Sequence, residues 1–243
     1  MLKLYVIGIG PGNYENMTVR ADRALRESDT IVGYHVYTDL VRPIYPDKEY
    51  LTTGMTREAD RCRMAVEEAK KGKTVSMVCS GDSGIYGMAG LIYEVRGEDE
   101  SVEVEVIPGL TAACSGGAVL GAPLTHDFAV ISLSDRLTEW SKIETRLHNA
   151  AEADLSIVLY NPKSKGRPDY LAKACDILLG VLNEDRLCGV VRNIGREGQS
   201  HELMTLRELR DYDADMFCTV FIGNAMTRRI GSSMVTPRGY RDV

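Results

Sequence analysis

The stretch Val78–Gly90, VCSGDSGIYGMAG, ends an apolar run and at once places one carboxylate, that of Asp82, among small residues. Glycines keep side chains away from this carboxylate at positions 81, 84, 87 and 90. In open α/β sheets, ligands bind at the carboxyl ends of parallel strands. We therefore expect Asp82 to accept hydrogen bonds from a cationic or hydroxylated ligand. The alternative is that it caps the N-terminus of the helix that follows.

Strand and helix patterns alternate on both sides of this stretch. Residues 3–7 form an apolar strand pattern, and residues 18–28 carry apolar residues at helical spacing. A second helix is expected over residues 57–71, with strands over 74–79 and 102–106. Alternation of this kind predicts a parallel sheet with helices packed against it.

The alternation pauses near residues 121–125 and then starts again, so we place a domain boundary there. The expected domains are residues 1–122 and residues 123–243. The second series has strands over 128–133, 155–160, 187–192 and finally 217–222, helices over 139–151 and 168–182, and an apolar run over 201–206 followed by a small helix. The predicted fold class is α/β, with two α/β domains of similar size.

Composition and charge narrow the class of protein. The 243 residues contain 29 lysines and arginines against 35 aspartates and glutamates, a net charge of −6. No basic run resembles a nucleic-acid footprint, so nucleic acid is not an expected partner. No stretch approaches the roughly 20 apolar residues of a membrane span, and the first apolar run is too short for a signal peptide. We expect a cytoplasmic protein with no membrane partner. The six cysteines include no Cys-x-x-Cys pair, so neither disulfides nor a bound metal are expected.

The segment Gly8–Asn13, GIGPGN, resembles the dinucleotide-binding fingerprint Gly-x-Gly-x-x-Gly. Asn13 stands where the third glycine belongs, and Pro11 removes a backbone N–H group. A Rossmann dehydrogenase is therefore disfavoured. A tight turn between a strand and a helix also explains these glycines.

Four segments taken together resemble the tetrapyrrole methyltransferases of corrin biosynthesis. They are GIGPG at 8–12, SGDSGIYGMAG at 80–90, VIPGLTAACSGGAVLGAPLTHDFAVISLSD at 106–135 and LYNPKSKGR at 159–167. The portion HDFAVISLSD is similar to the branch of the family that methylates C17 of precorrin-3B or cobalt-factor III. One departure is Ser83, which stands where the family more often has proline after Gly-Asp.

The resemblance implies a cytoplasmic homodimer that binds S-adenosylmethionine (SAM) in a cleft between two α/β domains. It also implies a tetrapyrrole substrate, methylation at C17 and an associated contraction of the ring. Carried over by position, the cofactor contacts would be Pro11, Ser80, Gly81, Asp82, Ile85, Thr111 and Ala112 in the first domain, and Asn161, Asn193 and Gly195 in the second. These residue types suit SAM, which needs acceptors for its amino and hydroxyl groups and small residues where the backbone must approach.

Ring contraction must move protons and stabilise developing charge. The polar candidates for this chemistry are His126, Asp127, Ser134 and Asp135. The other interpretation of His126 is a structural histidine ahead of a buried strand.

The carboxylate arms of a tetrapyrrole require a few placed cations, because the protein itself is acidic. We favour Arg136 and Arg192 as substrate-binding residues, and further nearby cations are Lys163, Lys165, Arg167 and Arg196. The alternative for each of them is solvated surface charge.

Two rival functions stay open. One is a related SAM-dependent methyltransferase that acts at another corrin carbon or on another acceptor. The other is a nucleotide-binding module without chemistry. The sequence also leaves open whether the substrate is metal-free or contains cobalt.

Overall fold

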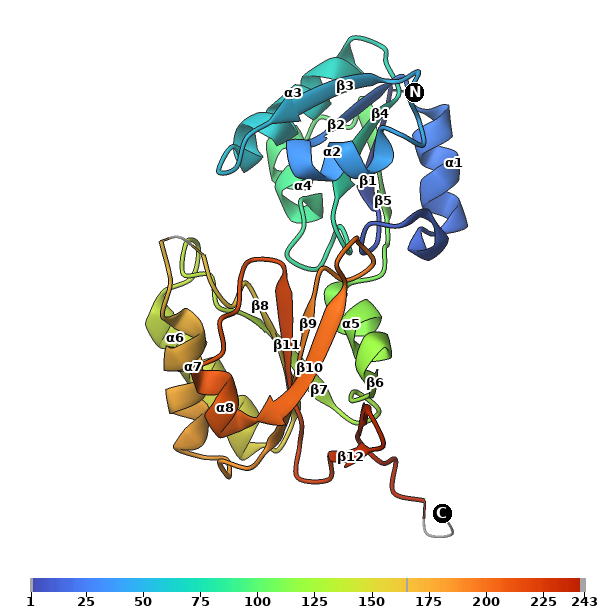
Figure 1. Ribbon diagram of the computed structural model, residues 1–243. Coiled ribbons are helices and arrows are strands. Elements are labelled where there is room, and N and C mark those ends of the chain that lie inside the picture. The colour runs from blue at the N-terminus through green and yellow to red at the C-terminus, as the bar shows by residue number, and fades with distance from the viewer. Residues whose placement is uncertain (1, 165, 241–243) are drawn as a thin grey trace. The chain divides into compact units, whose positions relative to one another are not determined.

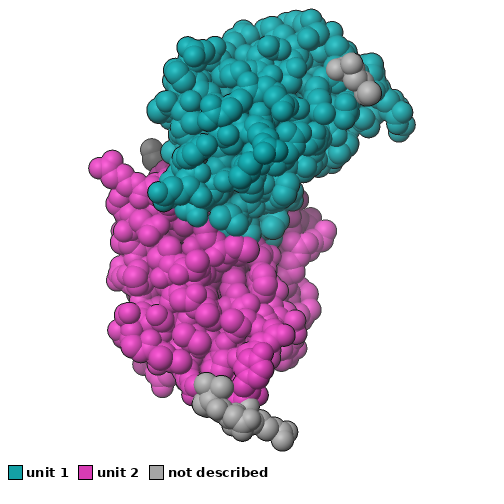
Figure 2. Space-filling model, turned by 90° about the vertical axis from the view of Figure 1, so that its right-hand side faces the viewer, with its two compact units in different colours: residues 1–112 teal, residues 113–243 magenta. Residues whose placement is uncertain are grey.

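The computed structural model describes residues 2–164 and 166–240 (Figure 1). The chain divides into two units, residues 1–112 and residues 113–243 (Figure 2). The boundary expected after residue 122 therefore falls inside the second unit. The reason is helix α5 (Ala112–Leu120), which packs on that unit: a Cβ atom added to Gly116 would lie 2.9 Å from the side chain of Ile194 and 3.0 Å from that of Phe221.

The sheet of unit 1 has five strands in the order β3-β2-β4-β1-β5, and every neighbouring pair is parallel, as the alternation predicts. The strands are β1 (Leu2–Gly8), β2 (Thr30–Tyr34), β3 (Glu49–Thr53), β4 (Val75–Cys79) and β5 (Val102–Ile107). The sequence patterns identified β1, β4 and β5, whereas β2 and β3 were not identified.

Helices cover both faces of this sheet (Figure 1). They are the 3-10 turn η1 (Tyr14–Asn16), α1 (Val19–Glu27), α2 (His35–Val41), α3 (Glu58–Lys70) and α4 (Ala89–Arg96). Side chains alternate along β1: Leu4 and Val6 join the core under α3 and α4, whereas Tyr5 and Ile7 join the core under α1 and α2. Helix α1 begins where expected because the Thr18 side chain accepts a hydrogen bond from the Ala21 N–H.

The sheet of unit 2 is mixed and has the order β10-β9-β11-β8-β7. Its strands are β7 (Phe128–Ser132), β8 (Ser156–Tyr160), β9 (Leu187–Arg192), β10 (Ser200–Thr205) and β11 (Cys218–Ile222). β10 and β11 run antiparallel to β9, because a hairpin and a short helix connect them instead of a long crossover. The strand expected over residues 217–222 is present as β11, but it is not the last strand, because two short strands follow it. A second small sheet joins β6 (Gly121–Ala122) to β12 (Arg228–Ile230) and β13 (Ser233–Val235).

Three helices pack on one face of this mixed sheet and α5 packs on the other (Figure 1). The three are α6 (Trp140–Glu152), α7 (Tyr170–Leu179) and α8 (Leu206–Arg210). Helix α6 buries the expected stripe, whereas α7 begins two residues after the expected Pro168, with Asp169 at its N-cap. Within the described residues, no helix has the length and apolarity to cross a bilayer.

Two glycines, Gly8 and Gly109, let the backbone segments at the carboxyl edge of the unit 1 sheet approach one another. A Cβ atom on Gly109 would lie 2.2 Å from the carbonyl oxygen of Gly81 and 2.5 Å from that of Gly8. A Cβ atom on Gly8 would in turn lie 2.7 Å from the Gly109 nitrogen. Only glycine fits at these positions, because the obstructing atoms belong to the backbone and cannot rotate away.

We expect Gly109→Ala to lower the free energy of unfolding by about 1–3 kcal/mol, the usual cost of inserting an atom into a packed region. The matched control is Gly90→Ala, because a Cβ atom there meets nothing within 4 Å and the residue lies inside α4. That control should leave stability unchanged or raise it by up to about 1 kcal/mol. Urea denaturation of both variants measures the difference, and equal effects would contradict the crowding argument.

Candidate functional site

The carboxyl edge of the unit 1 sheet has the topology that binds ligands in other α/β sheets. The chain leaves β1 toward α1 on one face and leaves the neighbouring β4 toward α4 on the other. The loops after these strands diverge at such a point and leave room between them. Here the two loops are joined by a pair of backbone hydrogen bonds, from Gly10 N–H to the Gly81 oxygen at 3.0 Å and from Gly81 N–H to the Gly10 oxygen at 2.8 Å.

Asp82 is held by backbone N–H groups from two loops. Its Oδ1 accepts hydrogen bonds from the N–H groups of Gly84 at 2.8 Å and Ile85 at 3.0 Å, and its Oδ2 accepts one from Gly109 at 2.9 Å. Helix α4 has Met88 at its N-cap and no side-chain cap, so the interpretation of Asp82 as a helix cap is wrong. Since a carboxylate has about four lone-pair positions, one remains for a ligand.

Ser83 explains the departure from the family's more common proline. Its side chain is buried, and its hydroxyl donates a hydrogen bond to the carbonyl oxygen of Ile107, the last residue of β5, at 3.1 Å. This bond and the one from Gly109 to Asp82 tie the loop after β4 to the loop after β5. Serine lacks the rigid ring of the proline that is more common here, but the Ser83 hydroxyl gives the turn an additional hydrogen bond.

The structure brings several of the predicted cofactor residues of unit 1 together. The Cβ position of Gly81 lies 3.6 Å from the Cα atom of Thr111 and 3.8 Å from the nitrogen of Ala112. Thr111 is buried, whereas the side chain of Ile85 is 42% exposed and free to meet a ligand. The remaining predicted positions are Pro11, which is buried in the loop after β1, and Ser80, which is half-buried directly after β4.

The second group of predicted cofactor residues lies along one edge of the unit 2 sheet. β7, β8 and β9 run in the same direction, so their carboxyl ends share that edge. The first residues after β8 and β9 are Asn161 and Asn193, and both are left-handed, with φ angles of 54° and 53°. Asparagine tolerates this conformation better than most residues, which allows the chain to turn sharply at both positions.

Hydrogen bonds fix this edge of the unit 2 sheet. The Asn161 side chain donates to the Ser132 hydroxyl at 2.9 Å, and the backbone N–H of Gly195 donates to the Gln199 side chain at 2.8 Å. Tyr160 contributes a contact that the sequence did not suggest: its hydroxyl accepts a hydrogen bond from the Ala113 N–H at 2.7 Å and so fixes the start of α5 at the end of β8.

The four polar residues predicted for catalysis are not brought together. His126 and Asp127 precede β7, whereas Ser134 and Asp135 follow it. A strand of five residues is roughly 16 Å long at about 3.3 Å per residue, so the two pairs cannot act on one bond. The Nε2 atom of His126 is buried and makes no hydrogen bond within the described residues.

Asp135 is held in its ionised form. Its carboxylate accepts hydrogen bonds from the Tyr170 hydroxyl and from Nε of Arg167. The hydrogen bond from Tyr170, followed by that from Arg167, lowers the pKa of the Asp135 carboxyl below its ordinary value. At neutral pH this group has no proton to donate, so it suits an anchor for the loop after β7 better than a general acid.

The two cations predicted to bind substrate differ in their surroundings. Arg192 pairs with Asp215 and donates a second hydrogen bond to the carbonyl oxygen of Asp213 at 2.9 Å. Arg136 is exposed and makes no ion pair within residues 2–164 and 166–240. Of the further candidates, Lys163 pairs with Asp213 and Arg167 with Asp135, whereas Lys165 lies outside the described residues.

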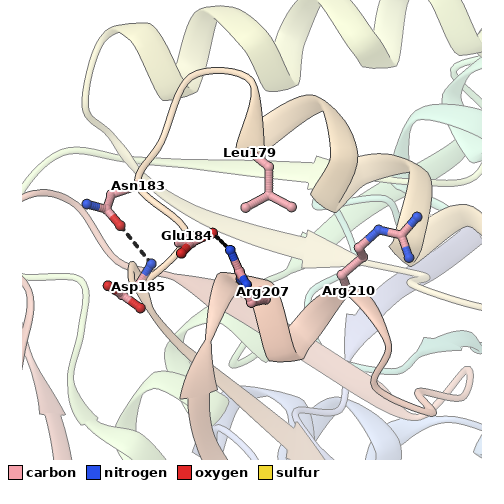
Figure 3. Close-up of a pocket in the computed structure, with 6 residues that line it drawn as sticks. All are labelled: Leu179, Asn183, Glu184, Asp185, Arg207 and Arg210. Atoms are coloured by element: carbon pink, nitrogen blue, oxygen red, sulfur yellow. Dashed lines mark hydrogen bonds and ion pairs between the residues drawn. The ribbon is translucent and has the colours of Figure 1, made fainter.

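Unit 2 has a shallow pocket of about 710 Å³ (Figure 3). Its lining residues are Leu179, Asn183, Glu184, Asp185, Arg207 and Arg210. They come from the end of α7, the segment before β9, and α8, so the pocket is at the opposite edge of the sheet from Asn161 and Asn193. Arg207 faces Glu184 in an ion pair, so the charges that line the pocket partly neutralise each other. We do not assign the site to this pocket.

The sequence and fold match known proteins over nearly the whole chain. A probable cobalt-factor III C(17)-methyltransferase of Salmonella typhimurium is 46% identical, and the match covers 98% of this chain and 99% of that protein. A precorrin-3B C(17)-methyltransferase of a Sinorhizobium species is 38% identical, with 98% and 96% covered. A cobalt-factor III methyltransferase of Priestia megaterium is 43% identical over 98% of this chain, which spans 45% of that protein's length.

Solved structures agree with these relatives. The crystal structure of the methyltransferase CobJ has a TM-score of 0.90 at 36% identity, covering 96% of this chain and 99% of that one. A uroporphyrin-III C-methyl transferase from Thermus thermophilus, complexed with S-adenyl homocysteine, shares the fold with a TM-score of 0.72 at 20% identity, covering 91% and 92%. The family model of the tetrapyrrole (corrin/porphyrin) methylases matches residues 3–210. This chain belongs to the tetrapyrrole (corrin/porphyrin) methylase family.

Proposed function

We propose that this protein transfers a methyl group from SAM to C17 of a tetrapyrrole, cobalt-factor III or precorrin-3B, with contraction of the ring, in cobalamin biosynthesis. The observation that carries the proposal is the 46% identity to the Salmonella protein over nearly the full length of both chains. We also propose that the protein is a homodimer and is cytoplasmic, as expected from the sequence.

The residues at the carboxyl edge of unit 1 suit the methionine end of SAM. Glycines at 81 and 84 leave the backbone open, because a Cβ atom on Gly84 would meet only the Asp82 side chain, at 3.3 Å. The free lone pair of Asp82 and the carbonyl groups of this loop are acceptors of the kind that an ammonium group or a hydroxyl needs. We propose Ser80, Gly81, Asp82, Ile85, Thr111 and Ala112 as contacts, with Pro11 shaping the pocket.

The turns after β8 and β9 in unit 2 suit an adenosine group. Asn161 and Asn193 adopt left-handed conformations, and Gly195, with a φ angle of 66°, continues the second turn. These three residues are the proposed contacts.

Bound SAM supplies an electrophilic methyl group on a sulfonium, so the protein has to align the acceptor carbon and exclude water. No nucleophilic side chain is needed. In agreement with this, burial raises the pKa of the Cys79 thiol, at the end of β4, to about 11 and keeps it protonated and inert. On the tetrapyrrole side we propose Ser134, Asp135 and Arg136 from the loop after β7, with Asp135 as the anchor of that loop. His126 and Asp127, at the other end of β7, are not part of the proposal.

The direct test is anaerobic incubation with methyl-labelled SAM and either cobalt-factor III or precorrin-3B, followed by mass analysis. We expect one labelled methyl group per product molecule, and the macrocycle that accepts it distinguishes the cobalt-containing route from the metal-free one. SAM binding without transfer to either compound would contradict the C17 assignment and would favour another acceptor or a binding module.

Asp82→Ala removes the acceptor of three backbone hydrogen bonds, so we expect its loop to open and the Kd for SAM, measured by calorimetry, to rise at least tenfold. The matched control is Asp99→Ala. Asp99 also accepts a backbone N–H bond, from Ser101 at 3.1 Å, but it lies before β5 at the opposite edge of the sheet. A Kd for Asp82→Ala equal to that of the control would refute the assignment.

Asp135→Asn should weaken the loop after β7 and lower the free energy of unfolding at pH 7 by about 1 kcal/mol, the upper range for a partly exposed ion pair. Because the folded state lowers the pKa of Asp135, its contribution is complete above the ordinary carboxyl pKa of 3.8 and is lost as the pH falls through the lower folded value. Denaturation curves for wild type and variant should therefore converge at strongly acidic pH. Asp169→Asn, which removes an exposed pair with Lys173, should have a smaller effect. A difference that persists in acid would contradict the anchor role.

A further inference from the structure

Arg61 is a buried arginine on the inward face of α3, with only 5% of its surface exposed. Its Nε donates a hydrogen bond to the Thr53 hydroxyl at 2.8 Å, and its Nη2 donates one to the carbonyl oxygen of Gly54 at 3.0 Å. Both acceptors are uncharged. Burying a charge without an opposite charge costs several kcal/mol, so such residues are almost always paired.

No carboxylate pairs with Arg61 in the part of the chain that the structure describes. Other arginines that are only partly buried do have such partners: Arg20 pairs with Glu105, Arg167 with Asp135 and Arg192 with Asp215. Among these four arginines, Arg61 is the most buried, and it is the one that has no carboxylate partner. That pattern is typical of a residue that receives its anion from a ligand.

The guanidinium still has donors available. Of the five N–H groups of an arginine, Arg61 uses one on Nε and one on Nη2, which leaves three. Nη1 donates a hydrogen bond to no described residue. It is also not one of the fully buried polar atoms that lack a partner, so solvent or a ligand can reach it. The remaining N–H groups are enough for a bidentate bond to a carboxylate.

The position of Arg61 also suits a ligand. Thr53 and Tyr34 are the last residues of β3 and β2, so the guanidinium lies at the same carboxyl edge as the loop of Asp82, which follows β4. In the order β3-β2-β4, two spacings of about 4.8 Å separate β3 from β4. Arg61, which is bonded to the end of β3, therefore lies on the order of 10 Å from that loop. This is the span between a reacting ring carbon and a side arm on a large macrocycle.

An aromatic ring lies beside the guanidinium, and a second ring packs against the first. The Tyr34 ring centroid lies 5.8 Å from the guanidinium, and the exposed His35 ring packs against Tyr34 with centroids 4.5 Å apart. A cation beside flat, partly exposed rings is complementary to an anion attached to a flat conjugated ligand.

We propose that Arg61 binds a carboxylate side arm of the tetrapyrrole and thereby fixes the orientation of the macrocycle at the carboxyl edge of unit 1. This inference rests on the proposed function, since it names the group of that substrate that Arg61 recognises. The competing explanation is that Arg61 only fastens the loop after β3 to α3.

The test compares Arg61→Met and Arg61→Lys with Arg63→Met. Arg63 lies on the same helix, is exposed and pairs with Asp60, so it serves as the matched control. For Arg61→Met we expect the KM for the tetrapyrrole, and its Kd from absorbance titration, to rise at least 30-fold, with the Kd for SAM within twofold of wild type. Arg61→Lys keeps the charge and should recover part of the loss, which also guards against a methionine variant that fails to fold.

A second measurement uses the same tetrapyrrole with its carboxylates converted to methyl esters. Wild type should bind the ester much more weakly than the acid, whereas Arg61→Met should discriminate less between them. The inference is overturned if Arg61→Met and Arg63→Met bind the tetrapyrrole equally, or if the tetrapyrrole and SAM affinities fall together with the unfolding midpoint. Failure of wild type to transfer a methyl group would reject the proposed function, whereas the titrations report on Arg61 without any transfer.

Discussion

The close backbone contact among Gly8, Gly81 and Gly109 is the constraint on which the candidate site depends. Strand β1 ends at Gly8, and Gly81 and Gly109 each lie two residues after the end of β4 and β5. The backbone segments touch there with no side chain between them. Such a contact leaves buried N–H groups that need acceptors. Asp82 supplies one to Gly109 and to its own loop, and so the carboxylate that stands out in the sequence has a structural task before any ligand arrives. One side chain therefore holds the loop in shape, and two of the three N–H groups that reach its carboxylate belong to glycines, Gly84 and Gly109.

The strands and helices with strong periodicity were predictable from the sequence. The stripes of α1, α3 and α6 are buried as expected, and β4, β5, β8 and β9 lie within one or two residues of their expected ranges. β2 and β3 were missed because Gly33 and the polar residues of 49–53 obscure the apolar pattern, and because β3 is an edge strand that is only partly buried. The short strands β12 and β13 were missed because three residues are too few for a period of two to be recognised.

The sequence predicted the loops of the site better than the partners of its side chains. Residues placed after strands, such as Asp82, Asn161 and Asn193, do lie at carboxyl edges, because a position after a strand in a parallel arrangement determines the edge. Chain proximity misled for His126 and Asp135, since an extended strand separates residues that are close in sequence. Arg61 was hidden for the opposite reason. Arg61 directly precedes the apolar stripe of α3 and is buried with it. From the sequence alone, a charged residue at that position is expected to be exposed to solvent, because its partners are not known.

The acidic net charge of the protein constrains the binding of the polyanionic substrate that we propose. With a net charge of −6, long-range attraction works against binding, so the affinity has to come from short contacts with individual cations. Three of the cations predicted from the sequence to bind substrate are already neutralised by their own carboxylates: Arg192 by Asp215, Arg167 by Asp135 and Lys163 by Asp213. These pairs shape loops and contribute little net charge. Arg61 and Arg136 have no such partner among the described residues, and the proposed recognition of substrate carboxylates rests on them. Arg61 is held on a helix by two hydrogen bonds, whereas Arg136 is exposed on the loop that Asp135 anchors.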